Sequence, residues 1–346
     1  MPALAPAVAA VRLAVRRALT GLPGAGPVLV ACSGGADSLA LAAAAAFVAP
    51  RLGRPVGLVT VDHALQAGSD RRAADVAAWA AGAGFAPAEA VRVDVAGRPG
   101  GPEAAAREAR YQALAEAARR HGAAALLTGH TRDDQAETVL LALARGAGPR
   151  GLAGMPPRRD LAGVPLLRPL LDIGREQTRK ACAALGLSPW EDPHNADPSY
   201  ARARVRADAL PALVRALGPG VVDNLARSAR LAAADAAALD ELAAAALSAA
   251  SPAAASSATD GPAGVRAPGG GLAVAALAGL APAVRTRVLH AWARELGASP
   301  AALSHRHVGA LDALVTDWHG QGEVHLPGGL RVGRRAGRLT AAGPPG

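Results

Sequence analysis

The sequence predicts an α/β protein with a doubly wound, mostly parallel sheet, followed by a smaller, mainly helical domain that ends in a β-hairpin. Apolar runs of strand length alternate with Ala/Leu-rich runs of helix length up to about residue 205, which is typical of βαβ units with right-handed crossovers. A Ser-Gly-Gly turn joins the first such strand to its helix. Beyond residue 208 this alternation ends, and helical patterns with a terminal arginine-rich hairpin replace it.

The first domain is assigned to residues 1–207, and its strands and helices follow from the same pattern. Arg12, Arg16 and Arg17 lie within the first apolar segment rather than before it, which favours an N-terminal helix over a signal peptide. The expected strands are Val28–Ala31, Val56–Val61, Ala90–Val95, Ala124–Thr128 and a short strand near Leu166 and Leu167. The expected helices are Asp37–Val48, Ser69–Gly82, Pro102–His121, Asp133–Arg145 and Gly174–Leu185.

The second part of the chain is expected to be mainly helical. Residues 208–247 predict a connecting helix, and residues 248–272 form an Ala/Ser/Pro/Gly-rich segment typical of a flexible linker. Residues 273–340 predict two amphipathic helices, Val284–Leu296 and His305–Asp317, and a hairpin with its turn at Pro327-Gly328-Gly329 before Leu330–Leu339. Residues 341–346 are expected to be a disordered tail.

The amino-acid composition indicates which kind of partner the protein binds, but it does not indicate the fold. The 346 residues carry a net charge of +9, which favours a polyanionic partner, although the arginine excess also fits a GC-rich coding bias. Alanine inflates the apolar share of 51%, and the longest apolar run is too short for a bilayer, so a cytoplasmic protein without membrane association is expected. Cys32 and Cys182 form no Cys-x-x-Cys pair, so they are expected to be core residues rather than a zinc or redox pair.

The strongest site signal is the segment Ser33-Gly34-Gly35-Ala36-Asp37-Ser38, between the first strand and the helix that follows. Two glycines permit a tight turn and let an anion approach the backbone, and the start of the helix adds free N–H groups. Asp37 would repel a phosphate unless a cation lay between them, so the pattern predicts a nucleotide phosphate with Mg²⁺. The alternative is an ordinary strand–turn–helix in which Asp37 and Ser38 cap the helix.

The same segment resembles the PP-loop signature of the N-type ATP pyrophosphatases, which have an adenine nucleotide α-hydrolase-like fold. No Gly-Lys-Ser or Gly-Lys-Thr occurs in the chain, so the segment is not a Walker A loop. The resemblance implies that ATP is cleaved between its α- and β-phosphates, that Ser33–Ser38 bind the phosphates and that Asp37 holds Mg²⁺. It also implies that Asp62 and His63, at the end of the second strand, lie against the adenine; the alternative for this pair is a surface turn.

A second cluster follows the strand that ends at Thr128. His130 comes directly after the strand, and Asp134 and Glu137 are i, i+3 neighbours on the next helix, where a carboxylate pair could bind a metal or an amine substrate. The alternative is a capping box, with Asp133 or Asp134 as the N-cap and Glu137 closing it. Because ligands of parallel sheets bind beyond the carboxyl ends of the strands, we expect this cluster to converge with Ser33–Ser38.

Two arginine-rich segments allow more than one interpretation. Glu103, Arg107 and Arg110 share a helix face, which is typical of a solvated ion-pair stripe. In Arg202-Ala203-Arg204-Val205-Arg206 all three arginines would share one face of a strand, but only the first and third would share a face of a helix. This segment could bind phosphates and, with aromatic residues nearby, stack a base, or it could be a solvated basic turn.

From about residue 25 to 210 the chain resembles the tRNA(Ile)-lysidine synthase family. The resemblance implies an ATP-dependent ligase that joins L-lysine to the wobble cytidine of tRNA(Ile) with a CAU anticodon, through an adenylated cytidine. Residues 273–340 resemble the family's helical tRNA-contacting domain. The stretches that carry the resemblance are the PP-loop, Val61-Asp62-His63, Glu103–Tyr111, Gly129–Thr138, Arg145–Gly148, Gly151–Met155, Arg168–Leu171 and Glu191–Asn195.

The resemblance also implies roles for single residues. Thr131 and Ala203 stand where the family often has His and Asn, so those two roles are either not needed here or have moved. The oligomeric state stays open, with a homodimer as one option. Two rival functions are a tRNA thiolase, which would need cysteines to carry sulfur, and a non-catalytic nucleotide- or RNA-binding protein. By resemblance the catalytic set is Asp37, Arg110, Asp134, Glu137, Asn195 and Arg206, His130 joins the nucleotide site, and Arg202, Arg204, Arg334 and Arg335 contact tRNA.

Overall fold

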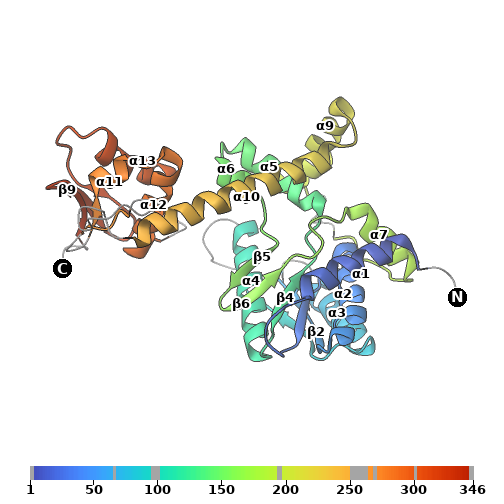
Figure 1. Cartoon of the computed structure of the whole chain (residues 1–346). Helices are drawn as coiled ribbons and strands as arrows, with labels where there is room; N and C mark the ends of the chain where they lie inside the picture. The colour runs from blue at the N-terminus through green and yellow to red at the C-terminus, as the bar shows by residue number, and fades with distance from the viewer. Residues whose placement is uncertain are drawn as a thin grey trace. The chain divides into compact units, whose positions relative to one another are not determined.

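The computed structural model describes residues 4–64, 68–94, 102–192, 197–249, 264–267, 271–299 and 302–342, with residues 102–104 described by their backbone only (Figure 1). Asn195 and the side chain of Glu103 therefore lie outside the described part. The chain divides into two compact units, Met1–Ala233 and Ala234–Gly346, and the boundary falls within the long helix α10 (Val221–Ser248). The five domain limits expected from the sequence stay a prediction.

The first unit is built on a six-stranded sheet in the order β3-β2-β1-β4-β6-β5. All neighbouring strands pair in parallel except β5 and β6, which form an antiparallel hairpin. The predicted doubly wound, mostly parallel sheet is confirmed, and its order reverses between β1 and β4, where such sheets bind ligands. The strands are β1 (Val28–Ala31), β2 (Val56–Asp62), β3 (Ala88–Arg92), β4 (Ala125–Thr128), β5 (Arg158–Leu161) and β6 (Val164–Leu167).

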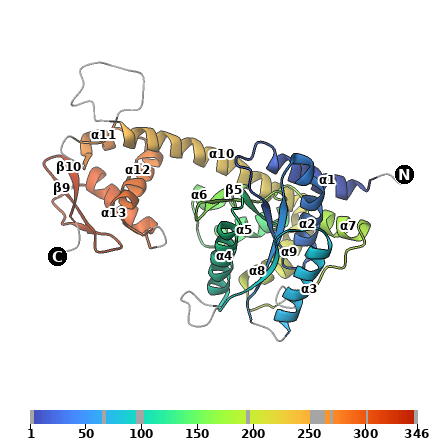
Figure 2. The same ribbon diagram turned by 90° about the horizontal axis from the view of Figure 1, so that it is seen from below.

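Helices cover both faces of this sheet, which explains why the central strands β1 and β4 are apolar along almost their whole length. One face packs against α1 (Pro6–Leu19), α2 (Ala36–Val48), α3 (Ser69–Gly82) and α7 (Arg175–Ala184). On the other face Leu114 of α4 (Pro102–Arg120) shares a core with Leu29 and Leu126. Figure 2 shows α4 on one side of the sheet and α1, α2 and α3 on the other.

The remaining helices of this unit carry the second half of the site. They are α5 (Arg132–Ala144), α6 (Pro149–Leu152), α8 (Ala201–Arg204) and α9 (Leu210–Leu217), with a short 3₁₀ turn at Pro50–Leu52. α8 continues into a π-helical turn at Val205–Ala209, so the segment 202–206 is helical and not a strand. The predicted helix over 208–247 is interrupted between α9 and α10 at Gly218, which has a φ of 92°.

Strand β5 is the one strand of this sheet that the sequence did not predict. Its residues are Arg-Arg-Asp-Leu, and their exposure alternates because β5 is an edge strand. The turn to β6 is formed by Ala162 and Gly163, both with positive φ, at 51° and 86°. Such a two-residue turn matches the twist of an antiparallel pair.

The second unit packs helices on a small antiparallel sheet in the order β7-β10-β9-β8. The predicted hairpin is present, but a turn at Ala336-Gly337 divides Leu330–Leu339 into two strands. Leu272, expected at the end of the low-complexity segment, is fully buried in β7. In the described ranges no helix combines the length and apolar character needed to cross a bilayer. The elements are β7 (Leu272–Ala273), α11 (Val274–Ala278), α12 (Pro282–Glu295), α13 (His305–Thr316), β8 (Val324–His325), β9 (Arg331–Arg335) and β10 (Arg338–Ala342).

Candidate functional site

The loop between β1 and α2 is a tight turn whose geometry leaves the helix N-terminus open. Gly34 has a φ of +83°, and a Cβ there would lie 3.1 Å from Val76 Cγ2, so the position requires glycine. The Ser38 hydroxyl accepts a hydrogen bond from the Ser33 N–H at 3.2 Å and donates to the Gly35 carbonyl at 2.9 Å. No side chain caps α2, so the predicted alternative of Asp37 or Ser38 as a cap is wrong, and its first N–H groups suit an anion.

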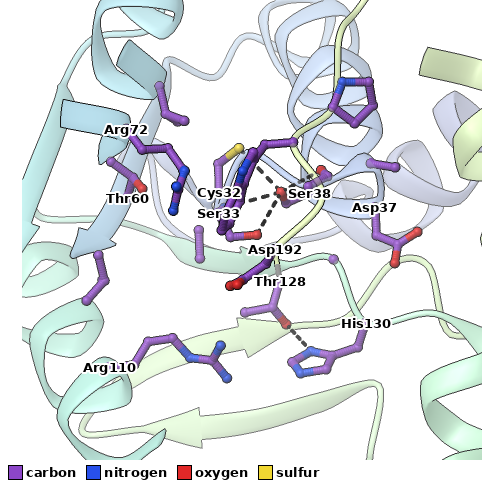
Figure 3. Close-up of a pocket in the computed structure, with 18 of the residues that line it drawn as sticks. Cys32, Ser33, Asp37, Ser38, Thr60, Arg72, Arg110, Thr128, His130 and Asp192 are labelled. Atoms are coloured by element: carbon purple, nitrogen blue, oxygen red, sulfur yellow. Dashed lines mark hydrogen bonds between the residues drawn. The ribbon is translucent and has the colours of Figure 1, made fainter. Parts of the chain in front are cut away.

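A cavity of about 1000 Å³ opens beyond the carboxyl ends of β1, β2 and β4 (Figure 3). The end of β4 packs closely on the start of α2, because a Cβ on Gly129 would lie 3.1 Å from the Asp37 backbone. The volume is at the top of the range for small-molecule pockets, so it can hold a nucleotide together with part of a second substrate. Of the predicted site residues, it is lined by Ser33, Gly35, Ala36, Asp37, Ser38, Asp62, His63, Arg110, His130, Asp134, Arg202 and Arg206.

Asp62 and His63 lie at the end of β2, as predicted. The Asp62 carboxylate is buried and accepts a hydrogen bond from the Ala64 N–H at 2.9 Å. Burial alone would raise the pKa of Asp62, but hydrogen bonds from Ser69 and Ala64 outweigh it and lower the pKa. Burial, with Arg110 nearby, lowers the pKa of His63, and its Nδ1 is buried without a partner among the described residues. The pair thus forms a fixed turn that offers one unused ring nitrogen to a ligand.

His130 is held as a neutral imidazole at the end of β4. Burial lowers its pKa to about 3; Asp134 opposes this shift, and Arg110, Arg168 and Arg107 add to it. Its Nδ1 lies 2.9 Å from Thr128 Oγ1, and that hydroxyl can donate to the Leu167 carbonyl at 3.5 Å. If the threonine donates to the carbonyl, Nδ1 carries the hydrogen and Nε2 is left as an acceptor.

The start of α5 is capped by Thr131, not by an aspartate. Thr131 has an extended conformation, and its hydroxyl lies 3.5 Å from the Asp134 N–H, while the Thr131 N–H donates to Asp134 Oδ2 at 2.8 Å. The predicted capping box, with Asp133 or Asp134 as the N-cap and Glu137 closing it, is therefore wrong, because Asp134 itself closes the box.

Asp134 and Glu137 face a set of arginines that already neutralise them. Glu137 is fully buried; its Oε1 accepts from Arg206 Nε at 2.8 Å, and its Oε2 lies 3.7 Å from Arg202 Nε. Arg206 Nη2 also lies 3.3 Å from Asp134 Oδ1. Arg202 and Arg206 converge because the segment is helical, whereas Arg204 donates to the carbonyls of Pro198 and Ser199 instead. The predicted carboxylate pair is thus part of a buried ion-pair cluster.

Arg175 and Thr178, in the first turns of α7, are site residues that sequence reasoning missed. Arg175 Nη2 lies 3.1 Å from Asp134 Oδ1 and 3.3 Å from Glu137 Oε1, and its Nε lies 3.6 Å from Asp37 Oδ2. The Thr178 hydroxyl donates to Asp37 Oδ1. No motif marks these residues, but helices that follow parallel strands begin near the ligand-binding rim, and that rule would have pointed to α7.

Asp37 is a partly buried carboxylate beside the phosphate loop, with Arg175 as a cationic neighbour. Burial raises its pKa, and Asp134 and Asp133 raise it further against the hydrogen bond from Thr178 and the charge of Arg175. Within the described part of the chain, no cluster of three or more His, Cys, Asp or Glu side chains could hold a metal by itself. Mg²⁺ typically binds through one or two carboxylates plus substrate phosphates, so a single carboxylate beside the phosphate loop fits this ion.

The predicted tRNA-contacting arginines of the second unit differ in their surroundings. Arg334 donates to the Leu314 carbonyl at 3.0 Å, at the end of α13, and its guanidinium carbon lies 5.3 Å from the centre of the Trp318 ring. Arg335 is largely exposed and lies 3.4 Å from a Glu323 carboxylate oxygen. Arg334 therefore supports the fold of this unit, while Arg335 is accessible to a partner.

The open turn, the unpaired helix start and the rim cavity define a PP-loop nucleotide-binding protein. A family model described as the PP-loop domain matches residues 12–213, and one described as the TilS substrate binding domain matches residues 272–340. The chain is 75% identical over 344 residues to the tRNA(Ile)-lysidine synthase of Salinispora arenicola, covering 99% of both chains. It is 52% identical over 361 residues to that of Streptomyces coelicolor, covering 97% of this chain and 98% of the other. The chain belongs to the tRNA(Ile)-lysidine synthase family.

A solved structure supports the same fold. The U34-tRNA thiolase NcsA from Methanococcus maripaludis, solved with its [4Fe-4S] cluster, aligns with a TM-score of 0.53 over 65% of this chain and 80% of that chain. The two sequences are 20% identical, so this likeness concerns the fold alone.

Proposed function

We propose that this chain is an ATP-dependent ligase that joins L-lysine to C2 of the wobble cytidine of tRNA(Ile) with a CAU anticodon. The cytidine O2 attacks the α-phosphate of ATP and pyrophosphate leaves; the lysine ε-amine then attacks C2 and AMP leaves. The observation that carries the proposal is one cavity, lined by the open phosphate loop and by Asp134, in a chain of this family; Glu137 lies buried behind Asp134 and shares its arginine partners. Such a reaction would take place in the cytoplasm, where tRNA and ATP are found.

The phosphate loop and the β2 end suit ATP. The open N-terminus of α2 and the Ser33 hydroxyl provide donors for the phosphates. His63 Nδ1, for which the described part of the chain offers no hydrogen-bond partner, is available to the adenine. Asp37 would hold Mg²⁺, which supplies charge neutralisation at the phosphates. The chain's own contribution is therefore positioning and electrostatic stabilisation rather than covalent catalysis.

The carboxylate pair could bind the lysine ammonium in place of an arginine side chain. Arg175 and Arg206 show that this cluster binds positively charged hydrogen-bond donors, since both contact Asp134 and Glu137 within 3.3 Å. An ammonium has the same charge, and its binding would replace one or more of these arginine contacts. The amine must lose a proton before it attacks, and neutral His130, whose pKa is lowered to about 3, is too weak a base to hold that proton.

The cysteines favour the ligase over the rival thiolase. Cys32 and Cys182 are both buried. Burial raises the pKa of each thiol, that of Cys182 to about 11, so neither is a ready thiolate that could carry sulfur.

The test is multiple-turnover release of pyrophosphate from ATP, together with incorporation of labelled lysine into a CAU-anticodon tRNA(Ile) transcript. We expect both to require lysine, and neither L-arginine nor a transcript with U34 should replace the natural substrate. Turnover without lysine, or label entering the U34 transcript equally well, would contradict the proposal.

Two variants test the assigned roles. Asp37→Ala should abolish pyrophosphate release, and full activity in this variant would exclude the metal role. Asp134→Asn should raise the KM for lysine more than the KM for ATP, because the side chain lies in the carboxylate pair and not on the phosphate loop. An equal effect on both constants would argue against a lysine site there.

A further inference from the structure

Four arginines surround Tyr111 on the side of the sheet covered by α4. The guanidinium carbons of Arg159, Arg107 and Arg110 lie 4.3, 5.2 and 5.4 Å from the centre of the Tyr111 ring. Arg168 is almost fully buried and close enough to act on the Tyr111 hydroxyl. Burial would raise the pKa of Tyr111, but these four positive charges lower it. We call these five residues the Tyr111 cluster.

No acidic side chain balances the Tyr111 cluster in the part of the chain that the structure describes. None of its four arginines is within ion-pair distance of a described carboxylate, in contrast to Arg175 and Arg206 across the cavity. Three of its polar atoms, Tyr111 Oη, Arg159 Nε and Arg168 Nε, are buried without a hydrogen-bond partner. Tyr111 and Arg168 are buried, Arg110 and Arg159 are half-buried, and Arg107 is exposed. Positive charge and unpaired polar atoms gathered at such a partly buried place cost stability, so a ligand explains the arrangement more readily than folding does.

Three members of the Tyr111 cluster line the cavity, on the wall opposite the phosphate loop. Tyr111 is 8% exposed, and it lines the cavity together with Arg107 and Arg110. Figure 3 shows Arg110 on one side of the cavity and Ser33 and Ser38 on the other. Two guanidinium groups and one phenolic hydroxyl at a cavity wall are a donor set for a phosphate group.

We propose that the Tyr111 cluster is a second phosphate site, which binds a phosphodiester of the RNA strand next to the nucleotide that reacts. This inference rests on the proposed function. Phosphate could come from ATP or from RNA, and the position favours RNA, because the open start of α2 on the other wall already provides the place for the ATP phosphates. A phosphodiester held here would fix the register of the strand and leave its base free to reach the reaction centre.

The first test is Tyr111→Phe, which removes the unpartnered hydroxyl and keeps the ring. If the hydroxyl binds RNA, the dissociation constant of the tRNA should rise about tenfold, as expected for a lost hydrogen bond to a charged group. The melting temperature should change little, because no described residue lies within normal hydrogen-bond distance of the hydroxyl. Loss of stability with unchanged tRNA affinity would show a structural role and overturn the proposal.

The second test is Arg107→Gln, with Arg119→Gln as its matched control. Both residues are exposed on α4 and both changes remove one positive charge, but Arg119 lies outside the Tyr111 cluster. Arg107→Gln should weaken tRNA binding and lower the salt slope of the binding constant by about 0.7–0.9, whereas Arg119→Gln should change neither. Equal effects of the two variants would overturn the proposal.

Two further measurements show whether the phosphate belongs to ATP or to RNA, and whether a negative result concerns the Tyr111 cluster alone or the ligase activity as a whole. ATP affinity measured without tRNA should be the same in Tyr111→Phe and wild type; a loss of ATP affinity would assign the cluster to the nucleotide instead. If the wild-type chain modifies its tRNA but Tyr111→Phe and Arg107→Gln bind RNA like the control, only this inference fails. If the wild type incorporates no lysine, the proposed function itself fails.

Discussion

Replacement of Arg175 by methionine should destabilise the first unit more than any other single arginine replacement on α7. Methionine keeps much of the aliphatic volume and removes the charge. Arg175 is only 17% exposed in its side chain and lies within 3.6 Å of Asp37, Asp134 and Glu137. Without Arg175, the negative charges of these three largely buried carboxylates are less well neutralised. The ion pairs that join α7 to α5 through this side chain are also lost.

The magnitude follows from these distances. At an effective dielectric constant of about 20, one charge pair at such a separation is worth about 5 kcal/mol before desolvation is subtracted. Breaking a buried ion pair by removing one partner costs about 3–5 kcal/mol. Arg206 still contacts Asp134 and Glu137, so the lower end applies, about 3 kcal/mol. For a unit of this size each kcal/mol lowers the melting temperature by about 2–4 °C, which gives a fall of about 6–12 °C.

The assay is thermal unfolding of the full chain, with hydrogen exchange of α5 and α7 reporting on the first unit. Arg179→Met is the control, because Arg179 lies on the same helix, is 59% exposed and makes one ion pair at 3.9 Å with an exposed Glu191. Its effect should stay within about 0.5 kcal/mol. Added Mg²⁺ should stabilise Arg175→Met more than wild type, since it can replace the missing charge. If the two variants unfold alike, the ion-pair cluster does not hold the unit together.

Three smaller predictions concern the helix start, the acid range and the second unit. Thr131→Ala should lose about 1–2 kcal/mol in urea unfolding while Thr131→Ser retains wild-type stability, and equal stability of all three proteins would refute the cap. Burial raises the pKa of Asp134, but Arg175 and the hydrogen bonds from Thr131 outweigh burial and lower the pKa below its usual 3.8. The ionised Asp134 therefore stabilises the fold above about pH 4, and this stabilisation is lost as the pH falls through the folded-state pKa. The stability difference between wild type and Asp134→Asn should therefore shrink on acidification, and a difference that grows would refute this sign. Arg334→Gln should lower the stability of the second unit, whereas Arg335→Gln should keep it and reduce the salt slope of tRNA binding by about 0.9; the reverse pattern would refute the assignment.

The parallel sheet and the rim cluster could be predicted because their signals are local. A buried parallel strand is an apolar run, a phosphate turn needs glycines, and strand ends meet at one edge, so Ser33–Ser38, Asp62-His63 and His130 could be placed together from spacing alone. Periodicity also gave the two alternatives for residues 202–206, a strand or a helix, and the structure shows the helix.

What escaped prediction depends on contacts between distant segments. Arg175 is one arginine among many in the sequence, and its role appears only when α7 packs beside α2 and α5. The cap of α5 was misassigned because several Asx, Ser or Thr residues can cap, and the backbone angles of Thr131 decide among them. The sequence likewise does not distinguish the arginines that pair with carboxylates on one cavity wall from those without a described carboxylate partner on the other.

The buried ion pairs of the cavity have a consequence for how the protein responds to ionic strength. Mobile ions screen exposed charges over a Debye length of about 8 Å at physiological salt, but they screen buried pairs much less. Glu137 is fully buried and its arginine partners are at least half-buried, whereas Arg335 is open to solvent. Salt should therefore slow the encounter with a polyanionic substrate while it leaves the rate of a bound complex nearly unchanged, so that ionic strength acts on KM and spares kcat.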